Sequence, residues 1–495
     1  IVLDFTAALD AATVEANIYL LDAGGAKVDA SDVYDGAKRV TLKPSAGLNA
    51  YASYRLIVDS GLKSAAGEAI LTGKVIRIRT GLDTSDKFPQ ISDEELLTKV
   101  QQQTFRYFWE GAEPTSGMAR ERTSSGATVT TGGTGFGVMA MTVAAERGFV
   151  TRSEACQRVQ RIVTFLAERA TSYHGAFSHW IDGQTGQTLP FSADDNGADL
   201  VETGLLFQGL LTARAYFDGA DAAESKLRAD ITALWEAVEW DFFTKEKVLY
   251  WHWSPDKGWA MNMPIQGWNE ALIVYVLAAS SPTHPIGREV YAEGWARGGA
   301  MRNGKLFYDT VLPLGEDYGG PLFWAQYSFL GLNPRGLSDA YADYWEQVCN
   351  HTRINYAYCV DNPKGYAGYG ADCWGLTASD IPDGYTASSP TNDRGVIAPT
   401  AALSSMPYTP DESMAALRFF YYKLGDKLWS DYGFIDAFDL TTGWFDRGMH
   451  IAIDQGPIVV MIENYRTGLP WNLFMSDKDV QRGLAELGFT VEAGS

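Results

Sequence analysis

The sequence predicts a mainly helical protein, an (α/α) barrel preceded by a small all-β sandwich. Three observations predict this fold class. Residues 1–84 hold the short alternating runs that are typical of strands, whereas helical periodicity dominates from residue 92 to residue 489. The loops between alternate helices are long and the other connections are short, which places the elaborate loops at one mouth of a toroid of helical hairpins.

Residues 1–84 form the predicted sandwich. Clusters of Gly, Asp, Asn and Ser separate the runs IVLDF, NIYLLD, RVTLKP, YRLIVD and VIRIRT. The segment TVEANIYLLDAGGAKVDASDVYDGAKRVTLKP and its continuation to LKSAAGEAI resembles a bacterial Ig-like domain. Such a resemblance implies a spacer module. A polar linker at 85–91 follows, and Ser92 with Glu94 and Glu95 predicts the start of the helical domain, 92–489.

About a dozen helices are expected in this second domain. The clearest periodic segments are 92–109, 133–147, 151–170, 199–217, 222–239, 268–279, 338–350, 411–424, 455–465 and 477–487. The intervening long loops are rich in Trp, Tyr, Gly and Asp, and they span 171–198, 245–267, 299–325, 356–394 and 430–454.

Bulk composition excludes several classes of protein. The 40 Lys and Arg against 61 Asp and Glu give a formal charge of −21, which opposes binding to nucleic acid or anionic lipid. No apolar run reaches the ~18 residues of a membrane span. The chain begins at Ile1 without Met or a signal sequence, so we expect a processed or truncated soluble product, periplasmic or secreted, and a monomer.

The four cysteines do not predict a metal site. Cys156, Cys349, Cys359 and Cys373 lack the paired CxxC spacing of zinc sites. The last three lie in a loop-rich stretch, where one disulfide could form in an oxidising compartment.

Four acidic residues lie at the starts of helix-like runs. Asp199 and Glu202 are three residues apart at the start of ADLVETGLLFQGLLTARAYF and share one helix face, while Glu270 and Asp454 follow glycine-rich approaches. Hydrolysis of a glycosidic bond needs one acid for the leaving oxygen and one carboxylate to activate water or attack carbon. The alternative is that Asp199 and Glu202 only cap the helix.

Aromatic residues, 13% of the chain, gather in the predicted mouth loops, where their rings could cover the C–H faces of sugars. Each of them could equally be a core residue. They are Trp180, Trp251, Trp253, Trp259, Trp268, Trp324, Trp374 and Trp444. His179 and His450 lie in mouth segments and could bind sugar hydroxyls.

Other chemistries lack their motifs. TGGTGFG at 131–137 has neither the GK[ST] ending of a phosphate loop nor the GxGxxG spacing of a dinucleotide fold, so it predicts close helix packing or a substrate-side turn. The six histidines form no HExxH, and no GxSxG occurs. We therefore expect neither a cofactor nor a catalytic metal.

Segments along 92–489 resemble the glucoamylase-like domain family, in particular glycoside hydrolase family 144, whose members act on β-1,2-glucans. The resembling segments are TGGTGFGVMAMTVAAERGFVTRSEA, GAFSHWID, ADLVETGLLFQGLLTARAYF, QGWNEALIVYVLAASSPTHP, PLFWAQYSFLGLNPRG, DCWGLTASDIPDGY and DQGPIVVMIENYRTGL. The resemblance implies an (α/α)6 barrel and an inverting hydrolase. It implies Glu270 as general acid, Asp454 as general base, and Asp199 and Glu202 as sugar-binding residues, with a substrate hydroxyl able to relay the proton.

The resemblance leaves alternatives open. Related domains in cyclic β-1,2-glucan synthases perform transglycosylation, and the glucoamylase label does not imply action on α-1,4-glucan. Endo action and sophorose-releasing exo action are both compatible with the motifs. Other classes are a hydrolase of another β-glucan or oligosaccharide, a polysaccharide lyase that would need an acidic substrate and a Tyr or His base, and a non-catalytic glycan-binding protein.

Overall fold

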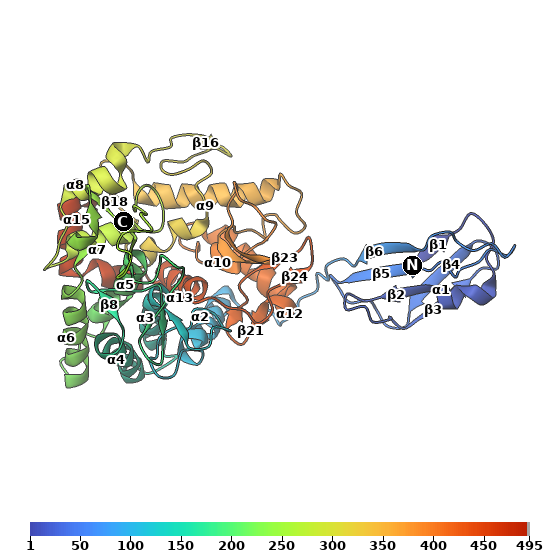
Figure 1. Cartoon of the computed structure of the whole chain (residues 1–495), viewed down its shortest axis with the longest axis horizontal. Helices are drawn as coiled ribbons and strands as arrows, with labels where there is room; N and C mark the ends of the chain where they lie inside the picture. The colour runs from blue at the N-terminus through green and yellow to red at the C-terminus, as the bar shows by residue number, and fades with distance from the viewer. Residues whose placement is uncertain (493–495) are drawn as a thin grey trace. The chain divides into compact units, whose positions relative to one another are not determined.

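The computed structural model describes residues 1–492 (Figure 1). The chain divides into two compact units, one from Ile1 to Asp86 and one from Lys87 on. The regular structure of the first unit is mainly strand, and that of the second is mainly helix.

The first unit contains two three-stranded antiparallel sheets, ordered β1-β4-β3 and β2-β5-β6. The five predicted runs are strands, and β3 adds a sixth that the sequence did not indicate because Ser31 and Asp32 interrupt its apolar pattern. Leu20 on β2 lies opposite Leu56 on β5, and both are fully buried in the core of this unit. The strands are β1 (Val2–Asp4), β2 (Ile18–Leu21), β3 (Ala30–Tyr34), β4 (Arg39–Pro44), β5 (Ser53–Val58) and β6 (Lys74–Arg79), with a short helix α1 (Val14–Asn17).

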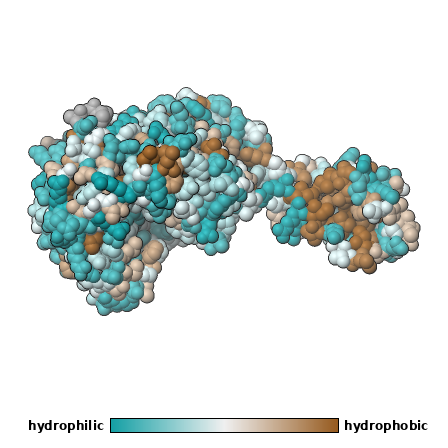
Figure 2. All heavy atoms as spheres, turned by 90° about the horizontal axis from the view of Figure 1, so that it is seen from above, coloured by the Kyte–Doolittle hydropathy of each residue, from teal (hydrophilic) through white to brown (hydrophobic). Residues whose placement is uncertain are grey.

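The surface of the first unit carries an apolar area, which is brown in Figure 2. The large exposed apolar side chains of this unit are Val2, Val33, Leu71, Val75 and Ile76. Strand β6 is an edge strand and five of its six residues, including Val75 and Ile76, are exposed.

The ten predicted helices are all present in the second unit. Most boundaries differ by a few residues, but the helix predicted at 338–350 begins at Tyr344 and continues to Asp361, into the predicted loop 356–394. Ser92 forms the expected capping box: its hydroxyl accepts from the Glu95 amide at 3.3 Å, and the Glu95 carboxylate accepts from the Ser92 amide at 2.9 Å. The longer helices are α2 (Asp93–Trp109), α3 (Thr131–Glu146), α4 (Arg152–Glu168), α5 (Leu200–Tyr216), α6 (Ala222–Glu236), α7 (Leu272–Ser280), α9 (Tyr344–Asp361), α11 (Pro410–Arg418), α13 (Ala452–Arg466) and α15 (Lys478–Leu487).

Several elements of the second unit have no counterpart in the predicted set. The helices α10 (Pro399–Leu403) and α14 (Leu469–Met475) are too short to show a helical period. The long loops contain two- to four-residue strands, which are likewise too short to show alternation. Those near the site are β7 (Thr128–Thr130), β10 (Trp180–Asp182), β11 (Thr188–Leu189), β12 (Ala198–Asp199), β15 (His252–Trp253), β19 (Ala378–Ile381), β20 (Gly384–Ala387), β22 (Gly433–Phe434), β23 (Phe438–Asp439) and β24 (Trp444–Phe445).

Helices α3 and α5 approach each other through glycines. A Cβ atom built on Gly135 would lie 2.3 Å from the carbonyl oxygen of Leu205, and one on Gly209 would lie 2.1 Å from the carbonyl oxygen of Gly135. Helix α3 also packs against α13, and α5 packs against α7. The glycine-rich segment 131–137 is thus a close helix contact, one of the two roles that its sequence indicates.

The structure also answers two questions that the sequence raised, about membrane-spanning helices and about disulfides. Among residues 1–492, no helix combines the length and the apolar character that crossing a bilayer would require. Each of the four cysteines is a buried free thiol, so the disulfide that the sequence left open among Cys349, Cys359 and Cys373 is not formed in this structure.

Replacing Gly135 or Gly209 by Ala should destabilise the second unit. Although Ala is the better helix former by about 1 kcal/mol, the added methyl group meets backbone atoms that cannot rotate away, and overpacking of this kind costs about 1–3 kcal/mol. Urea unfolding would measure the loss against Gly370→Ala, where a Cβ meets only the Gly368 carbonyl at 3.9 Å. Unchanged stability of both helix variants would contradict the packing argument.

Candidate functional site

A cavity of about 420 Å³ opens in the second unit, within the ~300–1,000 Å³ of small-molecule sites. Its wall combines aromatic rings with a few ionisable groups from several elements. The lining residues are Glu121, Arg122, Thr130, His179, Trp180, Phe191, Val201, Glu202, Leu205, Trp251, Glu270, Phe323, Tyr327, Ala378, Tyr385, Ala387, Ile451 and Ile453.

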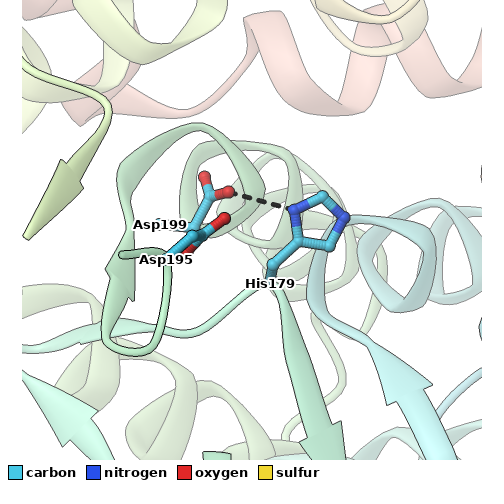
Figure 3. A group of neighbouring side chains, drawn as sticks. All are labelled: His179, Asp195 and Asp199. Carbon is cyan, nitrogen blue, oxygen red and sulfur yellow. Dashed lines mark hydrogen bonds and ion pairs between the residues drawn. The ribbon is translucent and has the colours of Figure 1, made fainter. Parts of the chain in front are cut away.

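Asp199 and His179 form an ion pair beside the cavity (Figure 3). Asp199 is the N-cap of α5 and accepts a hydrogen bond from the Glu202 amide at 2.9 Å. Its second oxygen lies 3.2 Å from Nδ1 of His179, and Nε2 of the same ring lies 3.9 Å from Oε1 of Glu202. Asp199 therefore caps the helix, as the alternative interpretation held, and also fixes a histidine of the cavity wall.

His179 carries the positive charge between these two acids. Burial lowers the pKa of His179, but the Glu202 charge and the hydrogen bond and charge of Asp199 outweigh burial and raise the pKa to about 9. The ring is therefore an imidazolium at neutral pH and compensates two carboxylates that are buried.

Glu202 is held by the first turn of α3. Its Oε2 accepts a hydrogen bond from the Gly132 amide at 2.6 Å and another from the Thr130 hydroxyl at 3.3 Å. A Cβ on Gly132 would lie 2.7 Å from that oxygen, so glycine is required for the carboxylate to reach the backbone. The amides of the first turn have no partner within the helix, and together with the helix dipole they favour a negative charge at this place.

Asp195 and His252 extend this group, and the sequence analysis did not select them. Nδ1 of His252 lies 3.4 Å from Asp195 and 3.9 Å from Asp199. Donor atoms of His179, Asp195 and Asp199 lie within 4.8 Å of one another, close enough to share an ion (Figure 3). Because His179 itself supplies a positive charge at neutral pH, the ion pair satisfies Asp199 without a metal.

Glu270 lies on the cavity wall just before α7. Its side chain is half-buried, and burial, followed by the charges of Asp199 and Glu202, raises the pKa of its carboxyl to about 7. A carboxyl group with this pKa holds a proton over much of the neutral range, as a general acid must.

Asp454 lies in the first turn of α13 and is 3% exposed. Burial, followed by the charge of Asp436, raises the pKa of Asp454 well above its ordinary value. Tyr327, on the cavity wall, connects the two acids: burial raises its pKa first, and the charges of both Asp454 and Glu270 add to the effect. The two proposed catalytic acids therefore lie around one aromatic residue of the cavity.

A second acidic cluster surrounds Arg122, and none of its members other than Asp454 was selected from the sequence. Nη1 of Arg122 lies 2.8 Å and 3.0 Å from the two oxygens of Asp380, and Nε lies 2.9 Å from Glu121. Asp436 accepts a hydrogen bond from the Asp380 amide at 2.8 Å. Burial raises the pKa of Asp436 and of Asp446 to about 7.

The tryptophans selected from the sequence separate into two groups. Trp180 and Trp251 line the cavity. Trp268, stacked on Phe329, and Trp374 are buried in the protein interior, whereas Trp324 and Trp444 are half-buried and lie outside the cavity lining. Phe191, which was not selected from the sequence, lines the cavity instead. Its exposed ring contacts His179 and Trp180.

The remaining mouth residues pack within the protein. Trp253 and Trp259 contact Phe242, and His450 is buried between Thr123 and Ser430, whose hydroxyls lie 3.1 and 2.7 Å from its ring nitrogens. Spacing alone could not separate these aromatic residues from Trp180 and Trp251, because all of them lie in the same kind of loop.

Comparison with family models finds two matches. Residues 262–478 match the family described as "Putative glucoamylase", and residues 1–77 match the bacterial Ig-like domain. The second match agrees with the resemblance that the sequence of the first unit shows.

Individual relatives are also similar to this chain. An exo β-1,2-glucooligosaccharide sophorohydrolase (non-reducing end) from Parabacteroides distasonis is 48% identical over 421 residues, which are 80% of this chain and 58% of that protein. A solved structure of an endo-β-1,2-glucanase from Chitinophaga pinensis, with sophorotriose and glucose, is 51% identical with a TM-score of 0.79 over 81% of this chain and 99% of its own. A "putative glucoamylase" from Bacteroides uniformis is 58% identical with a TM-score of 0.80, over 82% and 99%.

Replacing His179 by Ala should destabilise the protein most in mildly acidic solution. Asp199, which is fully buried, would lose its cationic partner, a loss of about 1–3 kcal/mol in the free energy of unfolding. The folded pKa of His179 is about 9 against 6.5 unfolded, so its contribution is fully present below pH 6.5 and disappears as pH rises through 9.

Urea unfolding of both proteins from pH 6 to pH 9.5 would measure the difference. His284→Ala is a matched control, because His284 and its partner Asp241 are 39% and 54% exposed. A constant gap between wild type and His179→Ala over this range would contradict the ion pair.

Proposed function

This chain belongs to the family that contains these β-1,2-glucanases and glucoamylase-like proteins, and on that premise we propose that it is a glycoside hydrolase that cleaves β-1,2-glucans by an inverting two-carboxylate mechanism. The observation that carries the proposal is the position of Glu270 and Asp454, two acids of raised pKa on separate helix starts, around Tyr327 of an aromatic cavity. Inverting glycosidases need this pairing of an acid with a base across the scissile bond.

Glu270 is the proposed general acid. Its pKa of about 7 keeps the carboxyl protonated for donation toward the leaving glycosidic oxygen, directly or through a hydroxyl of the substrate. The nearby charges of Asp199 and Glu202 support the role, because they oppose ionisation of Glu270 before the bond breaks.

Asp454 is the proposed general base. It would take a proton from the water that attacks the anomeric carbon, on the face of the sugar opposite to the leaving group. Both of its carboxylate oxygens are buried and receive no hydrogen bond from a donor among the described residues, so one of them remains available to accept from that water.

The proposed sugar-binding residues are those that line the cavity beside Glu270. Glu202 and His179 offer charged hydrogen-bonding groups to hydroxyls, with Asp199 orienting the histidine from behind. Trp180, Trp251 and the exposed ring of Phe191 offer faces for the apolar side of a glucose ring. The other six tryptophans selected from the sequence lie outside this lining.

We propose further that the chain consists of the domain 1–84, the linker 85–91 and the helical domain 92–489, and that the helical domain closes as an (α/α)6 barrel. Support comes from contacts of α13 with α3, α3 with α5, α5 with α7 and α10 with α13, which follow one another as inner helices would. A periplasmic or secreted location fits an extracellular glucan as substrate. We also propose that the protein acts as a monomer.

Incubation with linear β-1,2-glucan should yield glucose oligomers, whereas soluble starch should remain intact. Chromatography of the products over time tests this. Sophorose alone from the first time point would identify exo action, and a ladder of oligosaccharides would identify endo action. If neither glucan is cleaved, the proposed function is wrong.

Replacing Glu270 by Gln should abolish turnover without unfolding the protein. An amide cannot donate the catalytic proton, and loss of general acid catalysis costs about 10²–10⁴-fold. Because burial makes the charged carboxylate unfavourable above its unfolded pKa of 4.5, the variant should be at least as stable as wild type at pH 7.

Initial rates of wild type, Glu270→Gln and the exposed control Glu289→Gln would be compared, with thermal unfolding in parallel. The rate of the wild type should also fall as pH rises through about 7, where Glu270 loses its proton. Wild-type rates in the folded Gln variant would exclude Glu270 as the acid.

A further inference from the structure

Asp436 and Asp454 are neighbouring buried carboxyl groups, each of which shifts the pKa of the other. They are 4% and 3% exposed. Oδ2 of Asp436 accepts a hydrogen bond from the Asp380 amide at 2.8 Å, whereas Oδ1 of Asp436 and both oxygens of Asp454 have no donor among the described residues. Two ionised carboxylates only accept hydrogen bonds, so a hydrogen bond between these two side chains requires a proton on one of them.

The surroundings do not supply a cation to this pair. Arg122 is the positive group of the cluster, and its guanidinium is already bound to Asp380 and Glu121. Asp446 contributes a further acid next to Asp380. The titratable and charged groups that face Asp454 or Asp436 from the neighbouring elements are Asp380, Arg122, Asp446, Tyr385 and Tyr327, with Glu121 behind Arg122.

We propose that Asp436 and Asp454 share one proton, and that Asp436 is the positioning residue that keeps Asp454 able to act as the general base. This inference rests on the proposed function. The pair carries a single negative charge at neutral pH, as two close carboxyl groups in other active sites do. With the proton on Asp436, its hydroxyl donates to one oxygen of Asp454, and the other oxygen faces the attacking water.

The proton balance of the reaction follows. Water adds its oxygen to the anomeric carbon while the bond from that carbon to the glycosidic oxygen breaks. The leaving oxygen receives a proton that originates from Glu270, and the proton lost by water passes to Asp454. The pair then holds two protons and Glu270 holds none, so release of one proton from the pair and uptake of one by Glu270 restore the enzyme.

The arrangement favours a shared proton over a bound cation. Oxygens of Asp380, Asp436 and Asp446 lie within 4.8 Å of one another, a spacing that a divalent ion could bridge. Both oxygens of Asp380, however, are engaged by the guanidinium of Arg122, which would be repelled by a second cation. A calcium requirement is therefore the outcome that would overturn the proposal.

The substitutions Asp436→Asn and Asp436→Ala separate the proposal from a purely structural role. In Asp436→Asn, the side-chain oxygen can still accept from the Asp380 amide, and the NH₂ group then points to Asp454 and replaces the donated proton. In Asp436→Ala, Asp454 has no donor. The pH profile of kcat would be measured on linear β-1,2-glucan for both variants, with Asp431→Asn as the exposed matched control and Asp454→Asn as the inactive reference.

We expect Asp436→Asn to keep kcat within about threefold of wild type with the acidic limb of its profile in place, and Asp436→Ala to lose about 10²-fold, the contribution of an effective general base. The proposal is overturned if the two variants fall equally or both retain activity. It is also overturned if the acidic limb of Asp436→Asn moves down by about one pH unit or more, as removal of an ionised neighbour would cause.

A metal-removal experiment and a folding control complete the test. A loss of wild-type activity in EDTA that calcium restores would identify a cation site and overturn the shared proton. Should Asp436→Ala not fold, as judged by circular dichroism, the position of the acidic limb in Asp436→Asn decides alone. If Glu270→Gln and Asp454→Asn are inactive but Asp436→Asn and Asp436→Ala have the same kcat, this inference fails and the proposed function stands. A wild-type protein that does not cleave the glucan overturns both.

Discussion

The contact between α3 and α5 is the constraint on which the site depends. Gly135 and Gly209 let the two helices approach until a methyl group would collide with backbone oxygens. At that separation the Gly132 amide, in the first turn of α3, reaches the Glu202 carboxylate on α5 at 2.6 Å. A bulkier interface would leave Glu202 buried without this donor, and burying an unsatisfied carboxylate is costly.

The position of Glu202 then determines the electrostatics of the neighbouring groups. Together with Asp199 it keeps His179 protonated, and the same two charges help burial to keep a proton on Glu270. On one side of the cavity, His179 compensates one of the two negative charges of Asp199 and Glu202. In the cluster that contains Asp436 and Asp454, five acids surround the one positive group, Arg122, so the excess of acids is larger. There burial, followed by the charges of the neighbouring acids, raises the pKa of Asp436 and of Asp454, which favours protonation.

Most of the fold and part of the site could be predicted from the sequence. Long helices such as α5 were recognised because apolar residues recur along 199–217 at helical spacing, and Asp199 and Glu202 followed from their positions at its start. Short elements such as α10 and β19 were not, because five or fewer residues carry no measurable period. Asp380 and Asp436 were missed for a related reason: single acids in long loops have no spacing that distinguishes a buried carboxylate from a solvated one.

The sequence by itself determined the two-part organisation, the helical character of residues 92–489 and the acids at helix starts, because these depend on local periodicity and capping. The resemblance to β-1,2-glucan hydrolases likewise depends on local segments. Only the tertiary structure decided which aromatic residues face the cavity: Trp180 and Trp251 line it, while Trp268 and Trp374 are buried in the core. It alone placed Arg122 among five acids and put Asp436 against Asp454. Burial and the distances between charges depend on segments hundreds of residues apart, and a pKa follows from those distances rather than from the neighbouring residues in the chain.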